Sequence, residues 1–206
     1  MTIDAEQAIA DLVSGNVRFC KGLSDKQSAN SINKLREFAQ KSQTPKAIIL
    51  CCSDSRAPVE TIFDQDIGDL FVIRVAGNII APSLIGSVEF AANAFGTKLV
   101  VVMGHTRCGA IKATLDHIQN SESLATESIH DIISRIKPHV FTITKIKEIS
   151  ENQKLDLAVE ANVRASVSQL THSSRLIEGL VNNGELKIIG AVLDLDTGDV
   201  KFLEQP

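Results

Sequence analysis

The chain has 206 residues and a formal net charge of −4, with 44% hydrophobic and 22% charged residues. This composition is typical of a globular protein that is long enough for one domain with a sizeable core. The small acidic excess argues against a nucleic-acid partner, because phosphates are bound by a basic excess that this chain lacks. Its aromatic residues are eight Phe, with no Trp and no Tyr.

The start of the chain and its apolar runs indicate where the protein resides. The segment Met1–Phe19 lacks the positively charged N-terminal region of a signal peptide and carries three acidic residues. The longest apolar runs, Ala47–Cys52 and Leu99–Met103, are too short to cross a bilayer. We therefore expect no membrane partner and a cytoplasmic protein, whose four cysteines stay reduced.

The first half of the chain alternates between helical and strand patterns. Apolar residues at helical spacing predict helices, and continuous apolar runs predict strands buried on both faces. We expect, in chain order, a helix from Asp4 to Phe19, a loop over Ser24–Ser31, a short helix from Ser31 to Ala39, a strand over Ala47–Cys52, a strand over Leu70–Val75 and a helix from Pro82 to Phe95.

The second half continues the alternation. We expect a strand over Lys98–Gly104, a helix from Cys108 to Ile118, a helical stretch over Glu127–Ser150 that Pro138 kinks or breaks, a long helix from Asp156 to Asn182, a strand over Leu186–Leu193 and a hairpin that returns over Val200–Leu203. This order predicts an α/β fold with a mostly parallel central sheet flanked by helices. We expect a single domain over residues 1–206, with an N-terminal helical arm of about residues 1–40.

Metal-ligating residues follow two of the predicted strands. Cys52 comes at the end of one strand, and His105 and Cys108 lie just past another. Ligands of parallel sheets bind at the carboxyl ends of the strands, so neighbouring strands would bring these three side chains together. Two thiolates and one imidazole are good ligands for Zn²⁺, and three protein ligands leave the fourth position open for catalysis.

Asp54 and Arg56 accompany the first of these segments. Groups two residues apart in an extended or turning segment can point to the same side, so Arg56 can hold the Asp54 carboxylate in a two-pronged pair. That pair keeps Asp54 ionised and aimed. Without it, Asp54 is free to take the fourth zinc position, so these two residues offer an active and a self-blocked state.

The alternative to metal binding is a purely structural role, in which the cysteines are small hydrophobic residues of the core. That interpretation suits Cys51, which points away from Cys52 along the strand, and Cys20, which has no partner in the sequence. We expect the remaining histidines to be surface groups: His117, His130, His139 and His172. Asp194 and Asp196 lie beside a hairpin turn, where Asp commonly bonds to the backbone.

Several motifs together resemble those of the bacterial β-class carbonic anhydrases. The likeness runs over nearly the whole chain and is weakest over about residues 20–40 and 119–155. The motifs are Ser14-Gly-Asn-Val-Arg-Phe19, Gln43-x-Pro45, Cys52-x-Asp-Ser-Arg56, Gly68-Asp-Leu-Phe-Val-Ile-Arg74, Ala76-Gly-Asn78, Gly104-His-x-x-Cys-Gly-Ala110 and Gly190-Ala-Val-Leu-Asp-Leu-Asp-x-Gly198.

The resemblance implies a function and a set of site residues. It implies one zinc ion per chain on Cys52, His105 and Cys108, with an Asp54–Arg56 dyad beside it, and reversible hydration of carbon dioxide to bicarbonate and a proton by zinc-bound hydroxide. It also implies a homodimer or homotetramer with active sites at the dimer interface. Further positions match substrate-binding residues of the family: Gln43 as a hydrogen-bond donor, Phe71 and Ala76 in a small apolar pocket, and Gly109 through its backbone N–H.

The chain also departs from its relatives. Phe90 matches a substrate-pocket position of the family at which many relatives carry a tyrosine, so the resemblance implies that this hydroxyl is absent here. Some bacterial relatives have an allosteric bicarbonate pocket built with Trp and Tyr, which this chain cannot form. We expect the open site, with Asp54 on Arg56. Two alternatives remain: a hydrolase of carbon disulfide or carbonyl sulfide on the same fold, and a non-catalytic zinc protein.

Overall fold

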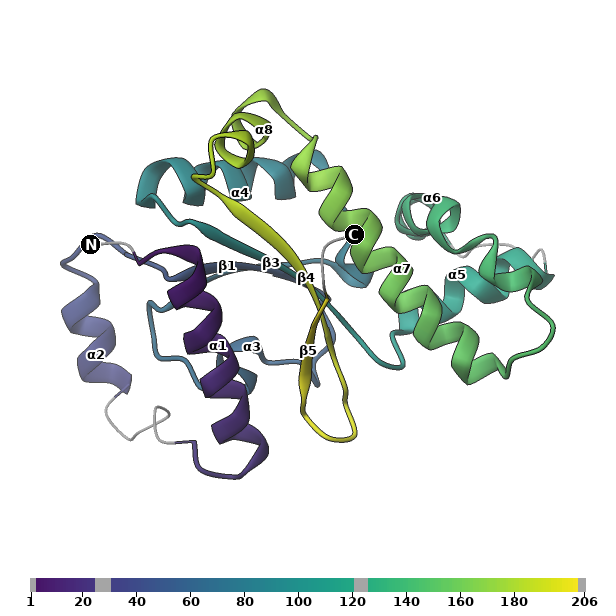
Figure 1. Ribbon diagram of the computed structural model, residues 1–206, viewed down its shortest axis with the longest axis horizontal. Coiled ribbons are helices and arrows are strands. Elements are labelled where there is room, and N and C mark those ends of the chain that lie inside the picture. Colours follow the sequence, from purple (N-terminus) through teal and green to yellow (C-terminus); the bar gives the residue numbers. More distant parts are fainter. Residues whose placement is uncertain (1–2, 25–30, 121–125, 204–206) are drawn as a thin grey trace.

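The fold is organised around one central sheet. A computed structural model describes residues 3–24, 31–120 and 126–203 (Figure 1). Over these ranges the strands are β1 (Ala47–Cys51), β2 (Leu70–Arg74), β3 (Leu99–His105), β4 (Lys187–Leu193) and β5 (Val200–Leu203), in the spatial order β2-β1-β3-β4-β5. The first four are parallel, and β5 pairs antiparallel with β4. The predicted α/β class with a mostly parallel sheet is confirmed.

The two central strands are buried on both faces, as their apolar runs predict. Along β1, Ala47, Ile49 and Cys51 pack into one core cluster, whereas Ile48 and Leu50 pack into another on the opposite face. This alternation follows the two-residue period of a strand. Helices cover both faces, so every residue of β1 and β3 is buried.

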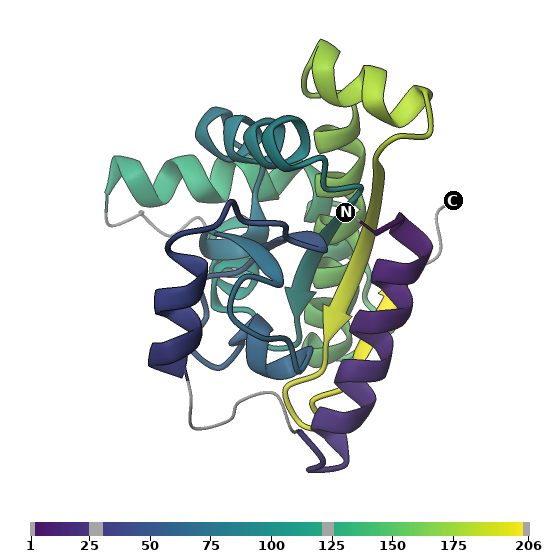
Figure 2. The same cartoon turned by 90° about the vertical axis from the view of Figure 1, so that its left-hand side faces the viewer.

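The helices of the described ranges are distributed over both faces of the sheet. They are α1 (Ala5–Cys20), α2 (Ser31–Phe38), α3 (Val59–Ile62), α4 (Pro82–Phe95), α5 (Gly109–Asn120), α6 (Glu127–Val140), α7 (Glu151–Thr171) and α8 (Arg175–Asn182), with short 3₁₀ turns η1 (Ala76–Asn78) and η2 (Ile143–Lys145). Residues of α1 and α3 join the first core cluster, and residues of α4, α7 and α8 join the second. Figure 2 shows α1 alongside β4, where Lys187 Nζ lies 2.6 Å from a Glu6 carboxylate oxygen.

The predicted long helix from Asp156 to Asn182 is wrong, because the structure has two helices there. The first, α7, starts earlier at Glu151, where Ser150 and Gln153 form a capping box. It ends at Thr171, and the Ser174 side chain then accepts a hydrogen bond from Ile177 N and starts α8. A cap in the middle of a helical apolar pattern is the physical reason for the break.

Other boundaries also differ from the expectations. The stretch expected to be helical over Glu127–Ser150 ends as α6 at Val140, two residues after Pro138, and continues into η2. The short elements α3 and η1 had no periodicity long enough to predict them. The loop expected over Ser24–Ser31 lies mostly at 25–30, outside the described residues. None of the helices in the described ranges combines the length and the apolar character that crossing a bilayer requires.

Candidate active site

The three predicted metal ligands meet at the carboxyl ends of β1 and β3. These strands are parallel neighbours with Cys51 opposite Met103, so Cys52 and His105 leave the sheet at the same edge. Cys108 lies directly before the first residue of α5. The donor atoms of Cys52, His105 and Cys108 all lie within 4.8 Å of one another, and the two Sγ atoms are 3.9 Å apart. All three residues are buried.

The electrostatics of the cluster favour one thiolate and one thiol. A hydrogen bond from Cys108 lowers the pKa of Cys52 to about 4, opposed by burial and helped by the His105 ring and the Gly77 N–H. The same hydrogen bond, together with burial, raises the pKa of Cys108. Burial acts to lower the pKa of His105, but the contact with the Cys52 thiolate outweighs it, and the net pKa is raised. Cys52 is therefore ready to act as a ligand near neutral pH.

His105 presents one ring nitrogen to the cluster. Its Nδ1 lies 2.9 Å from the Thr106 carbonyl oxygen, which accepts a hydrogen bond in the tautomer that leaves Nε2 without a proton and with its lone pair available to a metal ion. In the described part of the chain, Nε2 is buried without a hydrogen-bond partner. An orphaned buried nitrogen is costly, and a metal ion on this nitrogen and the two sulfurs removes that cost. The donor set fits Zn²⁺.

Asp54 lies beside the cluster and is held by Arg56. The Arg56 Nε and Nη2 atoms donate to the two Asp54 carboxylate oxygens at 2.9 and 2.7 Å, and the Arg56 backbone N donates at 2.9 Å. These hydrogen bonds hold the pKa of Asp54 well below its usual range, so the carboxylate stays ionised. Asp54 Oδ2 also lies 3.7 Å from His105 Nε2, which places an acceptor next to the candidate metal position.

Sequence reasoning did not identify Arg74, the last residue of β2, as part of the site. Its guanidinium donates to the Cys52 carbonyl oxygen at 3.2 and 3.0 Å and to the Asp54 carbonyl oxygen at 2.6 Å. Arg74 pairs with Cys51 in the register of β1 and β2, which aligns it with the turn after β1. A charged residue at the end of an apolar strand was the available signal.

The predicted substrate residues fall into two groups, one next to the Cys/His cluster and one away from it. Ala76 lies in η1 next to Gly77, whose N–H donates to Cys52 Sγ at 3.4 Å, and Gly109 follows Cys108 directly as the first residue of α5. Gln43 precedes the amino-terminal end of β1, whereas Cys52 follows the carboxyl end of the same strand.

Phe71 and Phe90 belong with Gln43 in the second group. Phe71 pairs with Ile48, about 13 Å along β1 from Cys52. The Phe90 ring lies 6.4 Å from the Phe71 ring and is 56% exposed. Within one chain, Gln43, Phe71 and Phe90 are therefore not brought to the cluster.

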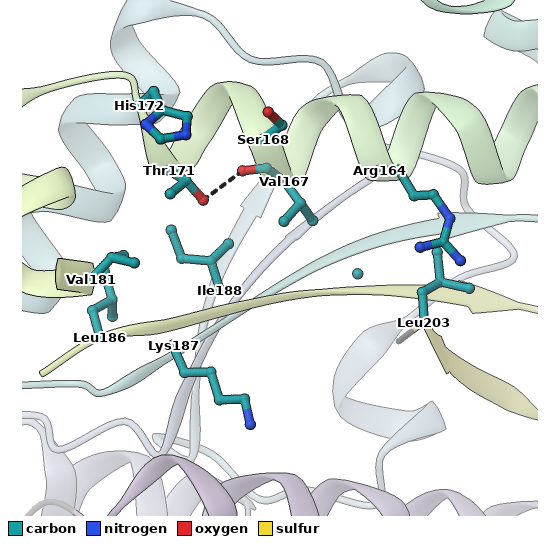
Figure 3. A pocket seen from close by; sticks show the side chains of 11 residues that line it. Arg164, Val167, Ser168, Thr171, His172, Val181, Leu186, Lys187, Ile188 and Leu203 are labelled. Atoms are coloured by element: carbon teal, nitrogen blue, oxygen red, sulfur yellow. Dashed lines mark hydrogen bonds between the residues drawn. The ribbon is translucent and has the colours of Figure 1, made fainter. Parts of the chain in front are cut away.

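A separate cavity of about 350 Å³ lies between α7 and β4, with Val181 and Leu203 at its margins (Figure 3). Figure 3 shows apolar side chains such as Val167 and Ile188 facing each other across it. Its basic side chains are already paired, because Arg164, Lys187 and His172 contact Glu160, Glu6 and Glu178 respectively. Among the residues that the structure describes, its lining has no cysteine and no carboxylate, so the Cys/His cluster is the stronger candidate for chemistry.

Comparisons with known proteins agree with this geometry. The sequence model of the family described as carbonic anhydrase matches residues 47–200, which includes all three candidate ligands. Carbonic anhydrase 2 of Mycobacterium tuberculosis is 34% identical over 187 residues, covering 91% of this chain and 87% of the relative. The chain belongs to the β-class carbonic anhydrase family.

Solved β-carbonic anhydrases share the fold. The Aspergillus fumigatus enzyme CafA has a TM-score of 0.73 at 26% identity, covering 94% of this chain and 91% of that one. A Sordaria macrospora β-carbonic anhydrase, described as tetrameric, has a TM-score of 0.71 at 24% identity, covering 96% of this chain and 97% of that one. These comparisons confirm three predictions from the sequence: the β-class carbonic anhydrase family, the α/β fold class and the assignment as a carbonic anhydrase enzyme.

Proposed function

We propose that this carbonic anhydrase holds one Zn²⁺ ion on Cys52, His105 and Cys108 and hydrates carbon dioxide reversibly to bicarbonate and a proton. The observation that carries the proposal is the meeting of three buried donor atoms within 4.8 Å beside a paired Asp54 and Arg56. When bound, zinc supplies Lewis acidity that lowers the pKa of a water molecule and makes it a nucleophile.

The residues of the chain orient the reactants. The Asp54 carboxylate, kept ionised by Arg56, accepts a hydrogen bond from the attacking water and turns its lone pair toward the carbon of carbon dioxide. The backbone N–H of Gly109 donates to an oxygen on which negative charge develops. Ala76 provides an apolar wall, which suits a small linear substrate without charge.

We further propose that a second copy of the chain completes each site. Gln43, Phe71 and Phe90 lie away from the cluster in their own chain, yet all three match substrate positions of the family. Phe71 belongs to β2, the edge strand of the sheet, and Phe90 is exposed beside it. Pairing two copies along this edge covers the exposed aromatic rings and supplies Gln43 to the partner's zinc. A homodimer or homotetramer in the cytoplasm, where thiols stay reduced, fits these requirements.

Stopped-flow measurement of carbon dioxide hydration on protein of known metal content tests the proposed chemistry. We expect about one zinc per chain and fast hydration that Cys52→Ala abolishes. Stoichiometric zinc with no hydration between about pH 7 and 9 refutes the proposal, since a metal-bound water of lowered pKa is ionised within this range. Sulfide release from carbon disulfide or carbonyl sulfide without hydration would assign the same site to the alternative hydrolase.

Subunit complementation tests the shared site. Cys52→Ala and Gln43→Ala chains carrying different affinity tags are expressed together, and the mixed dimer is purified through both tags. If Gln43 acts on the partner's zinc, the mixed dimer contains one intact site. Its hydration rate then exceeds the average of the two single-variant dimers. A rate at or below that average would show that each chain builds its site alone.

A further inference from the structure

The 3₁₀ turn η1 contacts the Cys52 sulfur and is itself held by a distant helix. Gly77 N donates to Cys52 Sγ at 3.4 Å. On its other side, Gly77 offers its carbonyl oxygen to the side chain of Asn162 on α7, with Asn162 Nδ2 at 2.9 Å. One glycine therefore connects a candidate metal ligand with a helix that begins 74 positions later in the chain, at Glu151.

A second hydrogen bond from α7 holds the same turn. Ser166, one helical turn after Asn162, donates from its Oγ to the Asn78 carbonyl oxygen at 3.1 Å. Asn162 and Ser166 are 1% and 2% exposed, so both hydrogen bonds are shielded from water. The turn therefore has two consecutive carbonyl groups fixed by one face of α7.

These polar residues are unusual choices for the buried face of a helix. A buried amide costs free energy unless it is hydrogen-bonded, and Asn and Ser are poorer helix formers than Ala or Leu. Their neighbours on the buried face include Ala158, Val159, Val163 and Leu170, which suit an apolar core. The two polar residues face the η1 carbonyl groups, so these contacts account for their presence.

The turn cannot easily adopt another arrangement while α7 holds it. Gly77 has a φ of +69°, and a Cβ atom at this position would lie 2.7 Å from Ile136 Cδ1. Its peptide groups are therefore confined by α6 as well as by Asn162. This confinement keeps the Gly77 N–H directed at the sulfur of Cys52.

We propose that Asn162 is a positioning residue for Cys52: its amide fixes the Gly77 peptide, which in turn donates to the sulfur that binds the metal. The inference rests on the proposed zinc site and extends it to a residue that does not touch the ion. A hydrogen bond to a metal-binding sulfur reduces its electron donation and holds its orientation. Loss of Asn162 frees the turn, so the sulfur changes its orientation and the metal leaves faster.

Cobalt substitution and zinc release test the inference. Asn162→Asp keeps the side-chain shape but removes the donor, and Asn162→Ala and Ser166→Ala remove single hydrogen bonds. Co²⁺ on sulfur has a near-ultraviolet charge-transfer band that reports the cobalt–sulfur bond directly. We expect the band to shift in the Asn162 variants and less in Ser166→Ala. We also expect zinc to transfer to a chromogenic chelator about 10-fold or more faster, the usual effect of removing a residue that supports a ligand.

Leu170→Ala is the matched control. It lies on the same helix, is fully buried and belongs to a different core cluster from the one that contains Cys52, so it lowers stability without touching the turn. It should keep the wild-type cobalt band and zinc release rate. The inference is overturned if Asn162 variants behave as the wild type does, or if Leu170→Ala shifts the band equally. A wild-type chain that binds no Co²⁺ overturns the zinc site itself, which distinguishes the two failures.

Discussion

Replacement of Gly77 by alanine should destabilise the protein more than replacement of any open glycine. The position has a φ of +69°, and an added Cβ would meet Ile136 Cδ1 at 2.7 Å and Ala110 Cβ at 3.2 Å. A left-handed conformation costs a non-glycine residue about 1–2 kcal/mol, and overpacking a core costs about 1–3 kcal/mol. We therefore expect Gly77→Ala to lower the free energy of unfolding by about 2–5 kcal/mol.

Two other glycines separate these contributions. Gly184 has a φ of +73° but nothing within 4 Å of an added Cβ, so Gly184→Ala should cost only the backbone strain of about 1–2 kcal/mol. Gly179 lies inside α8 with open space around it, and Gly179→Ala should stabilise the protein by about 0.5–1 kcal/mol. Gly77 and Gly184 share a positive φ and differ in crowding, whereas Gly184 and Gly179 are both open and differ in backbone conformation.

Urea unfolding at fixed protein and zinc concentration measures the three free energies, because both concentrations shift the apparent stability. Equal losses for Gly77→Ala and Gly184→Ala would refute the argument from crowding against Ile136. Wild-type stability in Gly77→Ala would refute the strain argument as well.

Three further predictions concern the site and the cysteines. Asp54→Asn should lower kcat/KM for carbon dioxide hydration by about 10²-fold or more while zinc content stays at the wild-type level, as stopped-flow kinetics and metal analysis will show. Removing zinc with a chelator should lower Tm by about 5–10 °C in differential scanning fluorimetry, because zinc at ~100 times its Kd stabilises the folded state by about 2.7 kcal/mol. Burial raises the pKa of Cys51 to about 12. Iodoacetamide at pH 8 should therefore label the exposed Cys20 in the folded protein and Cys51 only after unfolding, as read by mass spectrometry. Labelling of both cysteines at equal rates would contradict the burial of Cys51.

The central strands were predictable from the sequence because each is a continuous apolar run. Ala47–Cys52 and Lys98–Gly104 were expected as strands, and β1 and β3 occupy these runs to within one residue. A strand that is covered by helices on both faces buries every one of its side chains, so a continuous apolar run fits this position. The juxtaposition of Cys52 with His105 also followed once the two strands were taken as parallel neighbours.

The remaining contacts of the site depend on partners far along the chain. The bonds of Asn162 to Gly77 and of Arg74 to Cys52 join residues 85 and 22 positions apart. Asn162 belongs to none of the motifs, and Arg74 ends one of them without any sign in the sequence that it contacts Cys52. The break between α7 and α8 was missed because Ser174 interrupts an apolar pattern that otherwise stays helical. Local patterns report burial well, whereas a single cap or cross-chain hydrogen bond leaves little trace in them.

The distance along the chain between the two sulfurs has a thermodynamic consequence. Cys52 and Cys108 are 56 positions apart, so the proposed zinc ion on both would close a loop that contains β2, α4 and β3. In the chain-entropy description, a cross-link that closes a loop of this length removes about 4 kcal/mol of conformational freedom from any unfolded chain that keeps the link. The three ligands of the proposed site come together only where β1 pairs with β3, because Cys52 follows one strand and His105 ends the other. Zinc held by all three proposed ligands would therefore cross-link β1 and β3, so the ion proposed for catalysis would also stabilise the pairing of the two strands on which the fold depends.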